Sequence, residues 1–191
     1  MTLAEIITGC ENNSRKAQKE LYDLFYDEMM RTALFYCINQ DDAEHIVLDS
    51  LMDIFKTIGN FRGESSLKTW AKRIVINKSI NHYRKEQARK KHETLIEDNQ
   101  SGYFYLNNVI PDAASIINAK DIMLEVQSLP DSERIVFNLH AIEGYSHKEI
   151  AEKMNFAEGT SKWYYSNARK ALQEKLTVHS GLTYLSNQSG K

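Results

Sequence analysis

Residues 61–91 have the sequence FRGESSLKTWAKRIVINKSINHYRKEQARKK. Ten Lys or Arg and two acids fall within residues 62–92, a local charge of +8 in a chain whose total is −2. Apolar residues recur there at three- and four-residue steps, which predicts a helix with one buried face: Leu67, Trp70, Ala71, Ile74 and Val75. A strongly positive segment in a slightly acidic chain indicates a localised contact with a polyanion.

Two more helices are predicted upstream of this segment. Residues 17–38 have apolar side chains at helical spacing, and a polar break at residues 39–41 follows them. Asp41 or Asp42 is suited to cap the second helix, which ends at Gly59 and Asn60. Three helices with short connections can bury one shared core. We therefore expect a helical bundle domain over residues 1–92, in which Ser65 or Ser66 caps the basic helix.

The chain downstream divides into a linker and a second domain. Residues 93–133 have a net charge of −7, and we assign residues 93–128 to an acidic linker that includes a helix starting at Pro111. Residues 129–177 are expected to form the second domain, and residues 178–191 a polar, frayed tail.

The second domain has the outline of a helix-turn-helix. A first helix should begin at Pro130 and run to Ile142. Ser146 to Glu149 then has the Ser-x-x-Glu pattern of a capping box. A tight turn at residues 155–157 leads to a final helix from Glu158 to about Leu176. The predicted fold class is all-α, with an N-terminal helical bundle and a C-terminal helix-turn-helix joined by an acidic linker.

Composition limits the class of protein. The chain has 191 residues, of which 42% are hydrophobic and 26% charged, as expected of a soluble globular protein. No run of 18 apolar residues occurs, so no stable membrane insertion is expected. The N-terminus lacks the pattern of a secretory signal, which favours a cytoplasmic location. Cys10 and Cys37 lie far apart in sequence, which favours two reduced thiols.

One face of the basic helix suits contact with nucleic acid. Arg73, Asn77, Asn81 and Arg84 follow at steps of four, four and three, so they share one side. Arg binds phosphates, and Asn can form paired hydrogen bonds with a base edge. Further cations extend the charge: Lys72, Lys78 and Lys85. The preceding Arg62, Gly63, Ser65 and Ser66 suit an anion or a flipped base, although an ordinary capped turn has the same composition.

The final helix provides a second candidate surface. Its outer residues are Thr160, Lys162, Trp163, Ser166, Asn167, Arg169 and Lys170, whereas Ser161, Tyr165, Ala168 and Leu172 follow the buried spacing. A recognition helix contacts bases with its first turns and phosphates further along. Amphipathic surface helices share this pattern, so the capping box and the tight turn before it matter to the assignment.

The second helix has an acidic ridge, formed by Asp42, Asp49 and Asp53 at steps of seven and four. Carboxylates cannot face DNA, so this ridge either solvates the domain or meets a basic protein partner. His45 and Leu48 lie close to it. Catalytic and metal sites are not expected, because no phosphate loop, His-Glu-x-x-His or nucleophile elbow occurs. No cofactor is expected either.

Taken together, these segments resemble the sigma-70 family of bacterial RNA polymerase sigma factors, in particular the short extracytoplasmic-function (ECF) type. Residues 42–55 resemble the helix that binds core polymerase, and residues 61–77 resemble the segment that melts the promoter and contacts its minus-ten element. The segments within residues 129–172 resemble the helix-turn-helix that contacts the minus-thirty-five element. The resemblance covers roughly residues 10–90 and 112–177.

The resemblance implies partners and a role for each surface. Core RNA polymerase would bind Asp42, His45, Asp49, Met52 and Asp53. Promoter DNA would be contacted both as duplex, by the final helix, and as a melted strand, by the loop at residues 62–66 and by Asn77. An anti-sigma factor is a further implied partner. The chain would act without catalytic activity.

Some residues depart from the family pattern, and other functions fit part of the sequence. His45, Leu48 and Asn81 stand where acids or Gln are common, and Tyr164 and Asn167 stand in a helix that is often more basic. A helix-turn-helix regulator would explain the C-terminal half alone. A recombinase-like enzyme would need a nucleophile with clustered Arg, and an adaptor would use the basic helix to bind acidic protein.

Overall fold

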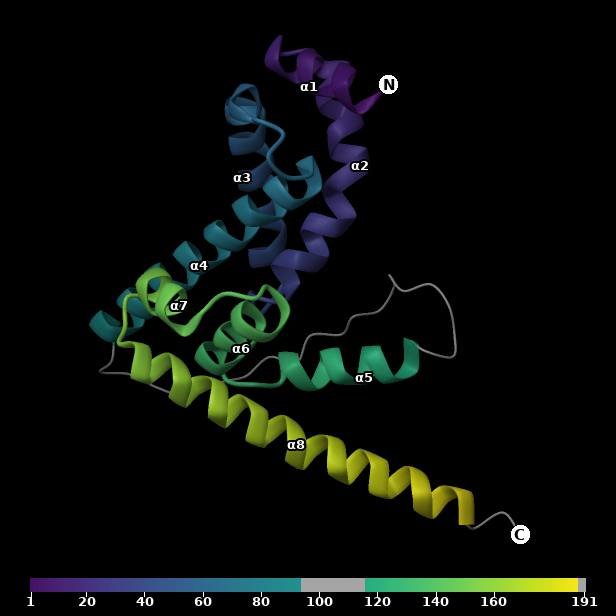
Figure 1. Cartoon of the computed structure of the whole chain (residues 1–191), viewed down its shortest axis with the longest axis vertical. Helices are drawn as coiled ribbons and strands as arrows, with labels where there is room; N and C mark the ends of the chain where they lie inside the picture. Colours follow the sequence, from purple (N-terminus) through teal and green to yellow (C-terminus); the bar gives the residue numbers. More distant parts are fainter. Residues whose placement is uncertain (94–115, 189–191) are drawn as a thin grey trace. The chain divides into compact units, whose positions relative to one another are not determined.

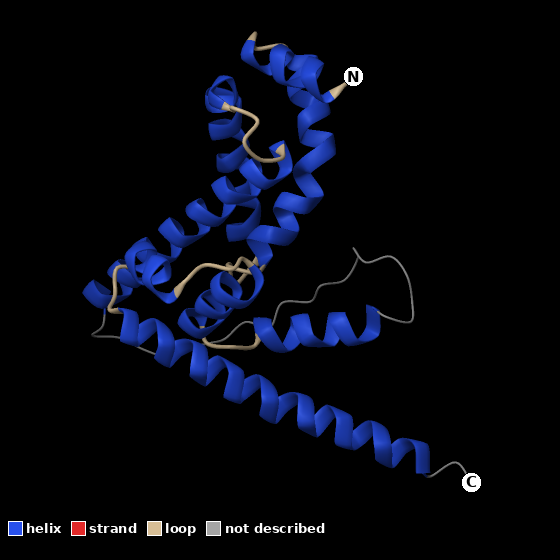
Figure 2. Ribbon diagram, in the orientation of Figure 1, coloured by secondary structure: helices blue, strands red, loops and turns tan. Residues whose placement is uncertain are grey.

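The computed structural model describes residues 1–93 and 116–188, with side chains placed for residues 1–90 and 122–175. All regular structure in these two ranges is helical (Figures 1 and 2). The chain forms two units, residues 1–100 and 101–191. The all-α, two-unit prediction is confirmed.

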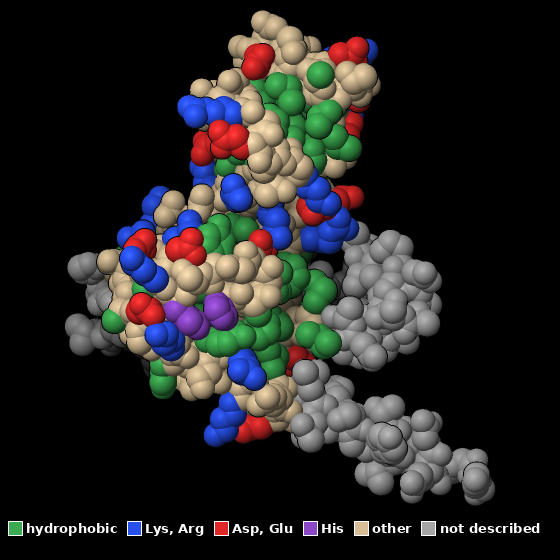
Figure 3. All heavy atoms as spheres, viewed as in Figure 1, with side chains coloured by type: hydrophobic (Ala, Val, Ile, Leu, Met, Phe, Trp, Pro, Cys, Tyr) green, Lys and Arg blue, Asp and Glu red, His purple; other side chains and the backbone are tan. Residues whose placement is uncertain are grey.

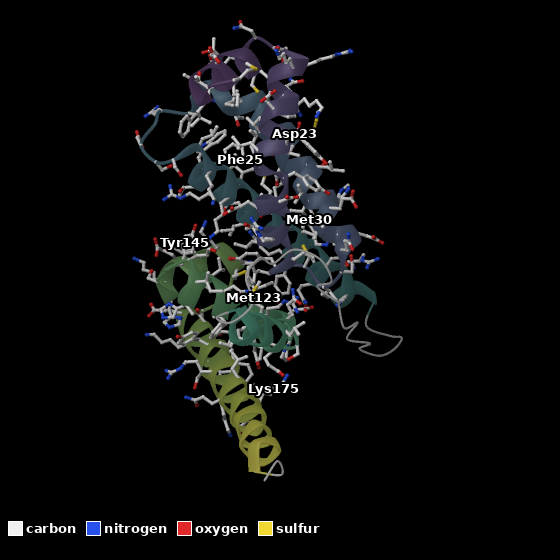
Figure 4. The ribbon with its side chains drawn as sticks, turned by 90° about the vertical axis from the view of Figure 1, so that its right-hand side faces the viewer. Asp23, Phe25, Met30, Met123, Tyr145 and Lys175 are labelled. Atoms are coloured by element: carbon white, nitrogen blue, oxygen red, sulfur yellow. The ribbon has the colours of Figure 1, made fainter. Side chains whose placement is uncertain are left out.

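The N-terminal unit contains α1 (Leu3–Glu11), α2 (Arg15–Leu34), α3 (Gln40–Thr57), the 3₁₀ turn η1 (Ile58–Asn60) and α4 (Leu67–Glu93). α2, α3 and α4 pack against one another, and α1 closes the end formed by α2 and η1 (Figure 1). Figure 4 labels Phe25, which is 7% exposed and belongs to the shared core. This core includes apolar residues of all three longer helices.

Some helix boundaries differ from the predicted ones, in particular where several polar residues could cap the same helix. α2 ends at Leu34 rather than residue 38. Asn39, not Asp41 or Asp42, caps α3, because its side-chain oxygen accepts a hydrogen bond of 2.7 Å from the Asp42 backbone N–H. α1 was not predicted; Thr2 and Glu5 form its capping box, and Ile6 and Cys10 are buried. Leu24 shares the apolar spacing of α2 but is exposed.

The C-terminal unit contains α5 (Ile116–Gln127), α6 (Asp131–Phe137), the π-helical segment η2 (Asn138–Ile142), α7 (His147–Met154) and α8 (Glu158–Gln188). Val126 and Leu129 pack against Ala168 and Leu172 of α8. The Lys175 ammonium, on α8 in Figure 4, lies 3.2 Å from the Glu125 carboxylate. These contacts hold α5 against α8.

Two predicted boundaries in this half need correction. We expected residues 93–128 to form a linker, but α5 packs on α8 and so belongs to the C-terminal unit. The predicted helix start at Pro111 and most of the predicted linker lie outside the described residues. The tail expected from residue 178 is also different, because α8 continues to Gln188.

Candidate nucleic-acid interface

The loop before α4 is set by a glycine turn and a serine cap. Gly63 has a φ of +73°, and a Cβ there would meet no atom within 4 Å, so backbone conformation rather than crowding favours glycine. The Ser66 hydroxyl accepts a hydrogen bond of 3.0 Å from the Thr69 backbone N–H, which confirms it as the cap. Arg62, Gly63 and Ser66 are exposed, and Ser65 is half-buried. The loop therefore presents polar groups to solvent at the start of the basic helix.

α4 keeps its predicted polar face exposed. Arg73, Asn77, Asn81 and Arg84 are all exposed, whereas Leu67, Ala71 and Val75 on the opposite side are buried. Within the described part of the chain we find no ion pair for Arg73, Arg84 or Lys85. These cations can therefore meet phosphates without first breaking an internal bridge.

Lys78 has a different environment from that exposed row. Its ammonium lies 2.8 Å from an Asp53 carboxylate oxygen and 3.9 Å from one of Asp49. One helical turn later, His82 Nε2 lies 3.5 Å from an Asp42 carboxylate oxygen. The carboxylates of the acidic ridge on α3 thus lie against Lys78 and His82 of α4. The sequence pattern did not predict the contact of His82, because spacing within one helix does not show which edges of two helices meet.

The outer face of α3 combines apolar and polar groups. His45, Leu48, Asp49 and Met52 are exposed, Leu48 at 47% and Met52 at 54%. Asp42 and Asp53 are half-buried because they face α4. Exposed large apolar side chains beside a carboxylate suit a protein partner better than DNA.

The helix-turn-helix geometry follows from its caps. The Ser146 hydroxyl accepts a hydrogen bond from the Glu149 backbone N–H, and the Glu149 carboxylate accepts one from the Ser146 backbone N–H, so the predicted capping box is present. The Ser146 hydroxyl also donates a hydrogen bond of 2.7 Å to the Glu149 carboxylate, and this bond, followed by the one from the Ser146 backbone N–H, lowers the pKa of Glu149. Asn155 ends α7 in the left-handed conformation, with φ +59°, and α8 starts three residues later. This short connection is typical of a helix-turn-helix.

α8 presents its predicted outer residues. Lys162, Trp163, Ser166, Arg169 and Lys170 are exposed, and Thr160 and Asn167 are half-buried. Ser161, Ala168 and Leu172 are buried, as the spacing predicted, whereas Tyr165 is half-buried. The Lys162 ammonium lies 2.7 Å from the Glu158 carboxylate, which lowers the pKa of that carboxyl group. About two turns further along α8, Arg169 and Lys170 are exposed, and the Arg169 guanidinium lies over the Tyr165 ring at 5.9 Å from its centre.

His140, in η2, and His147, in α7, form a stacked pair. The rings of His140 and His147 have centroids 4.2 Å apart, and the Tyr165 ring meets the His140 ring edge-on at 4.6 Å. His140 Nδ1 lies 2.7 Å from the Tyr145 carbonyl oxygen, and His147 Nδ1 lies 2.9 Å from the Ser161 hydroxyl. Burial, then the charges of His140 and Lys162, lower the pKa of His147. Figure 3 shows histidines at the surface among acidic and basic side chains.

Arg134 was also missed, and it supports the turn between α5 and α6. It is only 4% exposed. Its guanidinium donates hydrogen bonds to the carbonyl oxygens of Gln127 and Leu129, and it pairs with Asp131 at 2.8 Å. Among the described residues, no group of three or more His, Cys, Asp or Glu is placed to hold a metal ion. No helix in that part of the chain is long and apolar enough to cross a membrane.

Two family models match the chain, each on one unit. The model for sigma-70 region 2 matches residues 21–89, and the model for sigma-70 region 4 matches residues 119–172. The second match includes most of α5, in agreement with its packing on α8. The loop, the exposed face of α4 and the helix-turn-helix therefore lie within regions that family models identify.

Curated relatives extend over nearly the whole chain. The ECF RNA polymerase sigma-E factor of Haemophilus influenzae is 23% identical over 92% of this chain and 96% of its own length. RNA polymerase sigma-H factor of Pseudomonas aeruginosa is 23% identical over 85% of this chain and 89% of its own.

A solved structure is similar in fold. It is the sigma factor RpoE from Bartonella quintana, crystallised with the anti-sigma factor NepR; the TM-score is 0.50 and the identity 23%, over 84% of this chain and 96% of the other. The two region matches and the near-complete coverage of sigma-factor relatives agree with one another. This chain belongs to the sigma-70 family, and its curated relatives include members of the ECF type.

Proposed function

We propose that this protein binds core RNA polymerase, directs it to particular promoters and helps to open the minus-ten DNA. The observation that carries the proposal is that one chain exposes two separate helices suited to DNA. α4 presents Arg73, Asn77, Asn81 and Arg84, and α8 presents polar and basic residues after a short turn. A regulator that uses only a helix-turn-helix would leave the first surface without a role.

Promoter opening is assigned to the loop at residues 62–66 and to α4. Unstacking a base costs a few kcal/mol, so a site that holds the extruded base favours the melted state. Gly63 and Ser65 leave room beside the capped helix end, and Arg62 adds a positive charge. Asn77 then offers paired hydrogen-bonding groups to the melted strand, while Arg73 and Arg84 contact its phosphates.

Core polymerase is assigned to the outer face of α3. His45, Leu48, Asp49 and Met52 are exposed there, while Asp42 and Asp53 support the face through contacts with α4. The apolar groups supply buried area, and the carboxylate supplies complementarity to a basic surface. Neither step needs a chemical reaction by this chain, so we propose a factor without catalytic activity.

An anti-sigma protein is the natural regulator under this proposal. The structurally similar sigma factor of Bartonella quintana was solved with one. Such a protein would compete with core polymerase or with DNA for the surfaces above.

The test is reconstitution. The full chain is mixed with core polymerase from the same bacterium, and transcripts are collected from a pool of genomic promoter fragments. We expect a stable complex and transcripts that start downstream of a shared pair of sequence elements. Absence of both core binding and transcripts would overturn the proposal. DNA binding by the chain alone, with no gain from polymerase, would favour a helix-turn-helix regulator.

A matched pair of variants tests the docking face. Met52→Asp places a charge on the outer face of α3, and we expect core binding to weaken at least tenfold. Leu24→Asp is the control, because Leu24 is equally exposed, at 57% against 54%, but lies on α2. Equal loss in both variants would contradict the assignment of α3.

A further inference from the structure

Trp163 leaves most of its indole exposed on the surface of α8. Its exposed fraction is 58%, the highest among the large hydrophobic side chains in the described ranges. It is the sixth residue of α8. Leaving an indole in water forfeits the free energy that its burial would supply. An exposed position on a helix needs no aromatic residue for stability, so we look for a contact outside the chain that would bury the indole.

The helix surface around Trp163 leaves the indole accessible. Gly159 lies one turn earlier, and a Cβ added there would meet no atom within 4 Å. Packing within the protein therefore does not require glycine at that position. Ser166 and Asn167 lie one turn later and are short and polar. A large flat partner can thus approach the ring from the outer side of α8.

Neighbouring rings brace the indole. The Tyr164 ring lies 5.1 Å from that of Trp163 at an interplanar angle of 60°. Tyr164 in turn lies 5.8 Å from Phe156, which belongs to the turn between α7 and α8. A row of three aromatic rings therefore connects the turn to the exposed indole. Bracing of this kind reduces the entropy lost when the side chain makes a contact.

The chemistry around Trp163 favours DNA over a protein partner. Its exposed neighbours on α8 are Gly159, Lys162, Ser166, Arg169 and Lys170, none of them a large apolar side chain. Protein docking sites present contiguous apolar surface, and the exposed surface of α8 around Trp163 lacks it. In the major groove, the C5-methyl of thymine is the apolar group displayed on a base edge. The indole also has one N–H donor for a nearby base acceptor.

We infer that Trp163 is a specificity-determining residue that recognises a thymine methyl group in the major groove of the upstream promoter element. The inference rests on the proposed function, because it takes α8 as the helix that enters this groove. Beyond that function, it names the base that α8 selects and the chemical group on that base. Losing contact with one methyl group lowers affinity about fourfold.

The experiment replaces thymine by uracil, which lacks only the methyl group. Full chain with core polymerase selects duplexes from a library randomised at the upstream element. Each thymine of the selected element is then replaced singly by deoxyuridine, and affinity is measured. We expect one position at which the replacement weakens binding about fourfold. In Trp163→Ala, thymine and uracil at that position should bind equally.

Controls separate this inference from loss of fold or of general affinity. Trp163→Phe keeps an apolar ring and should retain part of the discrimination. Lys162→Ala should change affinity for both duplexes together and leave their ratio as in the wild type. A wild type indifferent to uracil throughout the element, or an unchanged ratio in Trp163→Ala, would overturn the inference. If the wild type with core polymerase selects no DNA, the proposed function itself fails.

Discussion

The Lys78 ammonium lies 2.8 Å from the Asp53 carboxylate, so the basic helix α4 is joined to the acidic helix α3 inside one domain. One turn along, His82 and Asp42 repeat the contact at 3.5 Å. The pairing divides the cations of α4 into two groups. Lys78 contacts carboxylates of α3, whereas Arg73 and Arg84 are exposed to solvent.

Lys78→Ala should impair promoter opening less than Arg73→Ala does. Lys78 already has carboxylate partners, and its release from them offsets part of any contact with phosphate. Its loss should lower the free energy of unfolding by less than about 1 kcal/mol, because both partners of the pair are partly exposed. Permanganate reactivity of the melted strand measures opening, and thermal unfolding measures stability. A larger opening defect for Lys78→Ala would show that Lys78 leaves Asp53 to bind DNA.

Asn77→Ala and Arg62→Ala should reduce promoter opening on the order of tenfold while leaving core binding nearly unchanged. Each removes one contact worth roughly 1–3 kcal/mol to the melted strand. Both residues are exposed, so their loss should not disturb packing. Opening is followed by permanganate reactivity and core binding by co-migration with polymerase. Parallel loss of both activities would instead indicate misfolding or a misassigned face.

The C-terminal unit should lose stability as pH falls below about 7. The pKa of His147 is lowered in the folded protein, so the unfolded chain takes up a proton first. Above the unfolded pKa of about 6.5 both states are neutral and stability is complete. As the pH falls below about 6.5, the free energy of unfolding declines until the pH reaches the pKa of His147 in the folded protein. The groups facing His147 are His140, Ser161 and Tyr165, with Lys162 and Glu158 close enough to act through their charges.

His147→Gln is the matched variant for that pH dependence. It keeps a polar side chain near Ser161 but cannot titrate, so the decline between pH 7 and pH 5 should become shallower. Hydrogen exchange of amides in α7 and α8 reports the C-terminal unit separately from α1 to α4. An unchanged slope in His147→Gln would assign the effect to another group.

Arg134→Ala should destabilise the C-terminal unit by about 3 kcal/mol. Its guanidinium is buried, and it satisfies two carbonyl oxygens and the Asp131 carboxylate, which would be left without this partner. Arg134→Lys keeps the charge but loses the forked geometry, so it should restore only part of the stability. Denaturant unfolding provides the measurement, with Arg169→Ala as an exposed control. Equal stability of both alanine variants would contradict a structural role for Arg134.

Local patterns predicted the parts of the fold that depend on neighbouring residues. A serine cap at residue 65 or 66, the Ser146–Glu149 box and most of the buried spacing of α4 and α8 were visible in the sequence, because these interactions span one helical turn. Boundaries failed where several polar residues competed for one cap, as Asn39 did with Asp41 and Asp42. α1 was missed because a nine-residue helix has too few turns to show a clear period.

The sequence by itself determined the all-helical class, the exposed row on α4 and the turn that defines the helix-turn-helix, since periodicity and caps act within one element. Only the tertiary structure decided which groups from different elements meet. It paired Lys78 with Asp53, stacked His140 on His147 and attached α5 to α8. Such contacts depend on how helices pack, and the spacing within one helix carries no information about the register of its neighbour.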